Sequence, residues 1–414
     1  MSDPTFGLSI TRVDNEPRPA VGADLSVIGL VVTAPDADAT RFPLNTPVLV
    51  FSDDATLEED LGTTGSVAHQ LDLINAQLGE FQVAARVVIV RADEGADDAA
   101  TMTNLIEALD GLETSGAVLG VVPRLIGIPG FTYQQEEDIE NPGVLLANPV
   151  IAALAGPLER MLAHAVVTGP HSTLQAFTDW RETIQSDRII PVETWVKVGA
   201  AATVVDSVGS ILGAGVRRDH EKQGRPFHSW ANQPIQGIVG PNRPIGFSLT
   251  DGATEGQTIL AANGGVILRG EAGVETAIAS GGFVFVGTDN AGEDDVWRFY
   301  NVTRGRDYIH LLFLRTLRFY LGRFNLTGQT IEAVTNTMKM ALRDLQADGD
   351  ILGFKMGFSR DQNNPEQLRL GKFTIDFAAE EAPVLRYIGV RSARYRPALD
   401  ALLDNLITQL DQAA

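Results

Sequence analysis

The chain has 414 residues, of which 44% are hydrophobic and 21% charged, so it is long enough for roughly two or three domains with sizeable cores. Its 53 acidic and 32 basic side chains give a formal net charge of -21, a balance that disfavours binding to nucleic acid or to an anionic membrane surface. The absence of cysteine excludes disulfides and thiolate metal sites.

The acidic residues are concentrated in the first two thirds of the chain. Residues 285–414 hold 16 Lys and Arg against 17 Asp and Glu, so by difference residues 1–284 carry a net charge of -20. We therefore expect the first region to face solvent and the second, rich in Arg, to contact partners, unless the charge is merely spread unevenly. Met1 to Pro4 shows no start of a signal peptide, so we expect synthesis in the cytoplasm without export.

The first 24 residues predict one isolated strand. Phe6, Leu8 and Ile10 alternate with polar residues and glycine, which is typical of a short strand. An extended, proline-containing segment follows, so no local hairpin partner is available. The strand is expected to pair with a distant part of this chain or with another subunit, and a loose terminus is the alternative.

Strands and helices then alternate from residue 25 onward. Apolar runs predict strands at 25–34, 48–51, 86–91, 117–122 and 165–167, and helices are predicted at 56–61, 66–77, 104–109 and 154–164. This order predicts an α/β domain over 25–284 with a largely parallel sheet. The Gly-rich stretch from about 206 to 284 predicts a mixed insertion with few helices.

Residues 285–393 predict a compact α+β domain. Helices are expected at 307–321 and 330–345, followed by strands at 352–358, 373–377 and 384–390. The second helix has a buried stripe of Ile331, Val334, Met338, Leu342 and Leu345, whereas Lys339 and Arg343 lie on its other face. The tail, residues 394–414, contains a short amphipathic helix with Leu399, Leu402, Leu403, Leu406 and Leu410 in register.

Catalytic and ligand-binding motifs are not found in the sequence. It has neither a phosphate-binding loop nor a nucleophile elbow, and its six histidines are scattered, so no cofactor is predicted. Two acidic loops, 289–295 and 361–366, lack the ligand pattern of an EF-hand and are predicted to be solvated turns, not metal sites. A Ser/His/Asp triad assembled from distant residues remains open, so a hydrolase-like α/β enzyme is the alternative to a protein without enzymatic activity.

Six segments, in this order and spacing, resemble the contractile tail sheath proteins of bacteriophages and R-type pyocins. They are residues 28–52, 87–95, 123–132, 217–244, 297–313 and 348–377. Each segment is weak evidence alone, but their order is specific. The chain departs from the family at 282–287, where Gly-Phe-Val-Phe-Val-Gly stands in place of a Trp-Gly-Asn-Arg-Thr-like turn.

This resemblance implies a structural subunit that polymerises helically around a tail tube and contracts to drive the tube through a cell envelope. The α/β domain would face outward, in a layer sometimes described as subtilisin-like, and the C-terminal α+β domain would face the tube. Arms at 1–24 and 394–414 would pair with neighbouring subunits. The implied partners are further copies of the chain, the tail tube protein, and the baseplate and tail terminator proteins, in a virion tail assembled in the host cytoplasm.

The resemblance also implies roles for particular residues. Lys339 and Arg343 are predicted to dock on the tube, while Phe6, Leu8 and Ile10 form the N-terminal arm strand and Leu399, Leu402 and Leu406 the C-terminal arm. Neither nucleic-acid binding nor insertion into a membrane is expected. A generic surface-array protein is a further alternative, because it too would polymerise without an active site.

Overall fold

The fold is described from a computed structural model, which defines residues 25–81, 83–138 and 140–413. The chain divides at Pro383 into two compact units, and each is described by itself. The predicted arm strand of Phe6, Leu8 and Ile10 lies outside the described residues.

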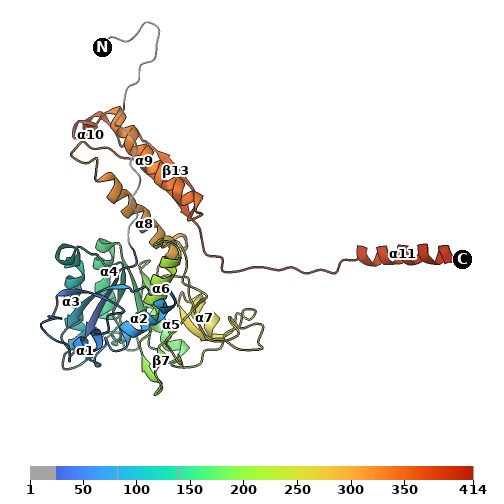
Figure 1. Cartoon of the computed structure of the whole chain (residues 1–414), viewed down its shortest axis with the longest axis horizontal. Helices are drawn as coiled ribbons and strands as arrows, with labels where there is room; N and C mark the ends of the chain where they lie inside the picture. The colour runs from blue at the N-terminus through green and yellow to red at the C-terminus, as the bar shows by residue number, and fades with distance from the viewer. Residues whose placement is uncertain (1–24, 82, 139, 414) are drawn as a thin grey trace, which may run out of the picture. The chain divides into compact units, whose positions relative to one another are not determined.

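A six-stranded sheet forms the centre of the α/β part of the first unit (Figure 1). Its order is β2-β3-β1-β4-β5-β6, and all neighbours are parallel except β2 and β3. The strands are β1 Ile28–Thr33, β2 Pro47–Phe51, β3 Arg86–Ala92, β4 Leu125–Gly127, β5 His164–Thr168 and β6 Ile189–Val192. Every residue of β1 is buried, as its continuous apolar run requires for a strand covered on both faces. The predicted α/β class with a mainly parallel sheet is confirmed.

Helices cover both faces of this sheet. On one face α1 (Leu57–Leu61), α2 (Gln70–Leu78) and α6 (Val208–Glu221) share a core with Ile28, Leu30 and Val32. On the other face α3 (Asp98–Leu119), α4 (Pro149–Met161), α5 (Leu174–Glu182) and α7 (Glu255–Ala261) pack with Val27 and Val31. The alternation of β1 side chains between the two cores follows from the two-residue period of a strand.

The strand predicted at 117–122 is wrong, because the helix α3 continues to Leu119. Asp97 caps the start of α3 by accepting a hydrogen bond from the Ala100 amide, and Gly120 ends it with a φ of 69°. Leu105, Leu109 and Leu112 are buried against the sheet, and this packing outweighs the local strand preference of the valines. The strand that follows α3 is β4, which begins at Leu125.

The prediction of few helices after residue 206 is also wrong, because α6 is one of the most buried helices of the fold. Glycine lowers helix propensity, but here it allows close packing. A Cβ at Gly213 would lie 2.8 Å from the Ile74 carbonyl oxygen, and one at Gly209 would lie 2.6 Å from that of Gln70. Small residues on α6 therefore bring its backbone against α2.

Two small sheets and a connecting segment complete this part of the unit. One sheet has the order β10-β7-β8 (Gly240–Pro241, Val196–Val198, Thr203–Val205), and the other has the order β11-β12-β9 (Val266–Arg269, Phe283–Val286, Gln233–Pro234). The expected domain boundary at 284/285 therefore falls inside β12. Short 3-10 turns lie at Gly79–Phe81 and Asp295–Trp297.

Two helices and a hairpin form the last part of the first unit. They are α8 (Tyr300–Leu317), α9 (Gly328–Ala347), β13 (Ile351–Gly357) and β14 (Asp376–Glu381), with the short α10 (Pro365–Arg369) in between. They share a third core that includes Ile309, Leu312, Met338 and Leu342. A register shift between Ile351 and Gly353 leaves Leu352 62% exposed, so Leu352 does not lie with Phe354 and Met356 as the alternation predicted. Phe358, placed on that face too, lies beyond the end of β13 and is exposed.

The second unit contains α11 (Pro397–Ala413) and the segment before it. The strand predicted at 384–390 is wrong for this chain, since no described strand pairs with it. Its side chains Leu385, Tyr387, Ile388 and Val390 are 69% to 85% exposed. They have the composition of a strand but no partner strand in the described chain.

Candidate functional site: the ionic network at the start of α8

The helix α8 begins inside the core of the α/β layer. The Tyr300 side chain is fully buried, and its hydroxyl donates to the Gly287 carbonyl at 3.0 Å and accepts from the Trp230 amide at 2.8 Å. Burial raises the pKa of the Tyr300 phenol above its usual value, so the hydroxyl stays protonated. These bonds fix the first turn of α8 to strand β12 and to the segment after α6.

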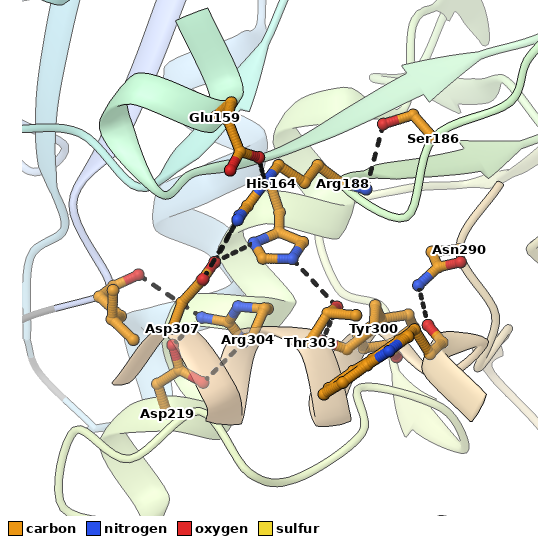
Figure 2. A network of polar contacts seen from close by, with 12 residues as sticks. Glu159, His164, Ser186, Arg188, Asp219, Asn290, Tyr300, Thr303, Arg304 and Asp307 are labelled. Carbon is orange, nitrogen blue, oxygen red and sulfur yellow. Dashed lines mark hydrogen bonds and ion pairs between the residues drawn. The ribbon is translucent and has the colours of Figure 1, made fainter. Parts of the chain in front are cut away.

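One turn further along, Arg304 forms a fully buried ion pair with Asp219 of α6 (Figure 2). The shorter of its two hydrogen bonds joins Arg304 Nη2 to Asp219 Oδ2 at 2.6 Å. Asp219 also accepts from the Ser26 hydroxyl, and the Arg304 guanidinium lies 4.9 Å from the centre of the Trp230 ring. Burial raises the pKa of Asp219 and Arg304 opposes that rise, so each charge needs the other in order to stay buried.

A second ion pair joins α8 to strand β6 and helix α4. Arg188, just before β6, donates to both carboxylate oxygens of Asp307, at 2.5 and 3.2 Å. Its Nε donates to Glu159 of α4 at 2.7 Å. This bidentate pairing fixes both the position and the orientation of the Arg188 guanidinium relative to Asp307, which a single hydrogen bond would not do.

His164, at the start of β5, lies between the two ion pairs (Figure 2). Its Nε2 is 3.0 Å from the Thr303 hydroxyl, and its Nδ1 is 3.8 Å from Asp307 Oδ2. Because that hydroxyl donates to the Tyr300 carbonyl, His164 Nε2 is assigned as the donor. Burial lowers the pKa of His164 well below 6.5, and Arg188 and Arg304 lower it further, so the ring is neutral at neutral pH.

The network therefore attaches one helix to the helices α4 and α6 and to the starts of strands β5 and β6. The same helix continues into the third core through Ile309 and Leu312. The helix α8 therefore connects the core that contains Tyr300 with the third core. Paired charges and a neutral histidine are suited to holding α8 rigidly against the α/β layer.

The hydrolase alternative is tested at the carboxyl ends of the parallel strands, where α/β enzymes place their sites. The buried carboxylate there, Asp206, accepts from the Gly130 amide and the Thr168 hydroxyl, both at 2.7 Å, and from the Val208 amide at 3.0 Å. His171 instead stacks on Trp195, with ring centres 4.1 Å apart. In the described part of the chain these two residues share no hydrogen bond, and Asp206 is used to hold loops together.

Of the sequence-predicted site residues, Lys339 and Arg343 lie on α9, which contributes no side chain to this network. Lys339 is half-buried and Arg343 exposed on α9, on a different face from Met338 and Leu342. Leu399, Leu402 and Leu406 are exposed on α11. The sequence analysis missed the network, because it began this helix at residue 307, after Arg304 and Arg306; the only signal was the group of charged residues just before the apolar run.

The described residues hold no cluster of three potential metal ligands and no helix with the length and apolarity to cross a membrane. Of the two acidic loops, the first is held by Arg298, which donates to Asp289 at 2.7 Å. In the second, Asn364 caps α10 by accepting from the Gln367 amide. Both loops therefore use their side chains to hold the local backbone.

Comparison with known proteins places the chain in a family, although no family model matches it. It is 24% identical to the tail sheath protein of Escherichia phage P2, over 99% of this chain and 100% of that protein. It is 28% identical to a putative prophage major tail sheath protein of Pseudomonas aeruginosa (strain UCBPP-PA14), over 88% of this chain and 90% of the relative. The chain belongs to the contractile tail sheath family.

Solved sheath structures have the same fold. The contracted sheath of an extracellular contractile injection system, PVC, matches with a TM-score of 0.68 over 96% of this chain and 99% of that chain, at 12% identity. The contracted helical sheath of the anti-feeding prophage matches with a TM-score of 0.67 over 95% of this chain and 100% of that one, at 14% identity. The resemblance of the six sequence segments to sheath proteins is thus confirmed by full-length similarity.

Proposed function

We propose that this sheath subunit polymerises helically around a tail tube and contracts to drive the tube through the envelope of a target cell. The observation that carries the proposal is the collinear match to the phage P2 tail sheath protein over nearly the whole of both chains. Subunits would assemble in an extended array and then repack into a wider, shorter one with better lateral contacts. Such a change between two packings needs no nucleotide.

The parts of the chain would divide the work by position. Residues 25–284 would face outward, as their acidic charge suggests, and 285–393 would face the tube. The six-stranded layer would be the subtilisin-like part of the family fold, as a fold and without proteolysis. Arms at 1–24 and 394–414 would connect subunits, and baseplate and tail terminator proteins would bound the array in a tail assembled in the host cytoplasm.

Specific residues follow from this arrangement. Lys339 and Arg343 on α9 would contact tube carboxylates, and Phe6, Leu8 and Ile10 would add a strand to the edge of a neighbouring sheet. Leu399, Leu402 and Leu406 would be covered by a neighbour, because apolar side chains in such a row are rarely left in water. We assign no catalytic role, which fits the structural hydrogen bonds of Asp206.

Electron microscopy of the purified chain tests this function. The expected result is hollow tubes with helical symmetry, formed without nucleotide. Flat two-dimensional arrays would favour a surface-array protein instead. Stoichiometric labelling of one serine by a fluorophosphonate probe would favour the hydrolase alternative.

A further inference from the structure

A pocket lined by basic side chains opens at the amino ends of strands β1 and β3. Its volume is about 440 Å³, many times the roughly 30 Å³ that one water molecule occupies. Arg86 at the start of β3 and Arg315 on α8 line it, together with His220 in the last turn of α6. None of the described residues that line the pocket is acidic, although residues 1–284 carry a net charge of -20. A basic pocket in an acidic part of the chain favours a carboxylate as its occupant.

A third arginine strengthens the positive potential at the α8 side of the pocket. Arg124, just before β4, is half-buried, and burial is the main cause that lowers the pKa of its guanidinium to about 10. Asp307 opposes this decrease and Arg315 adds to it, so the guanidinium groups of Arg124 and Arg315 repel each other. The Asp307 carboxylate is already bound by Arg188. A further carboxylate beside Arg315 would therefore offset this repulsion.

The described part of the chain begins at the wall of this pocket. Leu25 is buried in the third core, and the next residue, Ser26, lines the pocket. Asp24 precedes Leu25 directly, so its Cα is only about 3.8 Å from that of Leu25. It is also the only acidic residue between Pro17 and Leu25. Asp24 is thus the carboxylate that the shortest length of chain can bring to Arg86 and Arg315.

The residues before Asp24 suit the uncharged part of the lining. Residues 20–23 are Ala-Val-Gly-Ala, which are all small and apolar. The uncharged wall of the pocket includes Val83, Ala84, Ala85, Val216 and Tyr308. Small apolar side chains can approach such a wall closely, and the apolar surface buried there would add to the ionic contact. Charge and side-chain size therefore identify the same segment.

We propose that residues 20–24 bind in this pocket of their own chain, with the Asp24 carboxylate between the guanidinium groups of Arg86 and Arg315. Hydrogen bonds between arginine and carboxylate are strong and directional, so they would fix the segment in one position. Because Arg86 belongs to the central sheet and Arg315 to α8, Asp24 would also join these two elements. Residues 1–19 would then remain to reach a neighbouring subunit. The inference goes beyond the proposed function and does not depend on tube formation.

Limited proteolysis of the unassembled full-length subunit tests the proposal. An elastase-type protease cleaves after small apolar residues, so it can cut after Ala20, Val21 and Ala23, and also after Val390, whose side chain is 85% exposed. In the wild-type chain the cuts before Asp24 should be slow relative to the cut after Val390. Asp24→Asn should raise their rate by about tenfold, because cleavage follows the fraction of molecules in which the segment is released. Mass spectrometry of the fragments over time gives the rates.

Matched variants separate this contact from a general change in charge. Asp14→Asn removes a carboxylate outside the proposed segment and should leave the cleavage rates unchanged. Arg315→Gln should raise the rate as Asp24→Asn does, and the double variant should be cleaved little faster than either single one, because all three lose the same contact. If Arg315→Gln does not fold, the comparison of Asp24→Asn with Asp14→Asn still decides.

Two results would overturn the inference. The first is equal cleavage before Asp24 in the wild-type chain and in Asp24→Asn. The second is protection that increases with protein concentration, which would show that the segment binds in the pocket of a second copy. Neither result bears on the proposed function, because the subunits are not assembled in this experiment.

Discussion

Charged residues buried at the start of α8 hold together parts of the chain that are far apart in sequence. Arg304 and Asp219 are 85 residues apart, and Arg188 and Asp307 are 119 apart. The sequence shows only a group of charged residues before an apolar run, since no local pattern tells which carboxylate each arginine meets. The partners are set by how α6 and β6 pack against α8, so the network could not be predicted from the sequence.

Replacing Arg304 with methionine should strongly destabilise the fold. The change leaves Asp219 as a buried charge without its partner, and removal of one member of such a pair typically costs about 3–5 kcal/mol. Denaturant unfolding of the unassembled subunit measures the free energy of unfolding. Arg160→Met is the matched control, because its ion pair with Glu113 lies at the surface, where water screens the charges and loss of one partner should change stability little. Equal losses in the two variants would contradict the role given to the buried pair.

His164 should make the subunit less stable in acid. Its folded pKa is held well below 6.5, so as the pH falls below 6.5 the unfolded chain takes up a proton that the folded chain refuses. The free energy of unfolding then falls by about 1.4 kcal/mol per pH unit from this residue. Buried Asp219 and Asp307, whose pKa values are raised, act in the opposite direction at lower pH.

Comparison with His164→Gln isolates this contribution, because the glutamine cannot be protonated and retains a donor for Thr303. As the pH falls from 7.5 to 5.5, the unfolding free energy of the wild-type chain should fall relative to that of the variant. A difference that does not depend on pH would show that His164 titrates normally in the folded chain.

At the scale of elements, the sequence predicted the helices and strands whose apolar residues follow a single regular repeat. The continuous apolar run of β1 and the helix α9 are examples, and α9 was placed within two residues at each end. Of its predicted buried stripe, Met338, Leu342 and Leu345 are buried, whereas Ile331 and Val334 are only half-buried. The missed elements depend on tertiary contacts. The glycines of α6 indicate a loop until the helix is seen against α2, and the shift at Ile351 turns Leu352 outward without any mark in the sequence.

The close approach of α6 and α2 predicts that Gly213→Ala is destabilising. Alanine is the better helix former by about 1 kcal/mol, but its Cβ would lie 2.8 Å from the Ile74 carbonyl, which cannot move without the helix. Overpacking of this kind costs about 1–3 kcal/mol, so we expect a net loss of about 1–2 kcal/mol in unfolding free energy.

Gly156→Ala in α4 is the control for this prediction. Only the end of the flexible Arg160 side chain lies near its Cβ position, at 2.9 Å, so the helix propensity should dominate and raise stability by up to about 1 kcal/mol. If Gly213→Ala were also stabilising, the glycines of α6 would not be required for packing. Thermal unfolding of the two variants side by side decides the point.

At the scale of the whole molecule, the near-neutral charge of residues 285–414 contrasts with the acidity of the rest. The contrast in charge is visible in the sequence. The sequence does not show which basic residues contact a partner, because a basic residue on a helix is equally suited to facing solvent. The structure places Arg343 exposed and Lys339 half-buried on α9, away from its buried stripe. A face that is turned away from the core can contact a tube.

Charge reversal of this face is the sharpest test of the proposed docking. Lys339→Glu/Arg343→Glu should abolish coating of tail tubes at low salt, because two attractive contacts per subunit become repulsive. Each contact is worth only about 0–1 kcal/mol, but the effect adds over the many subunits along a tube. Weak pairs also suit a contact that must break on contraction, and added salt should weaken docking of the wild-type chain by screening.

Free polymerisation into contracted tubes should persist, since it does not involve the tail tube. Negative-stain images of mixtures with purified tubes give the measurement, with Arg360→Glu, outside α9, as the control for added negative charge. Normal extended coating by the double variant would show that this face of α9 is simply solvated.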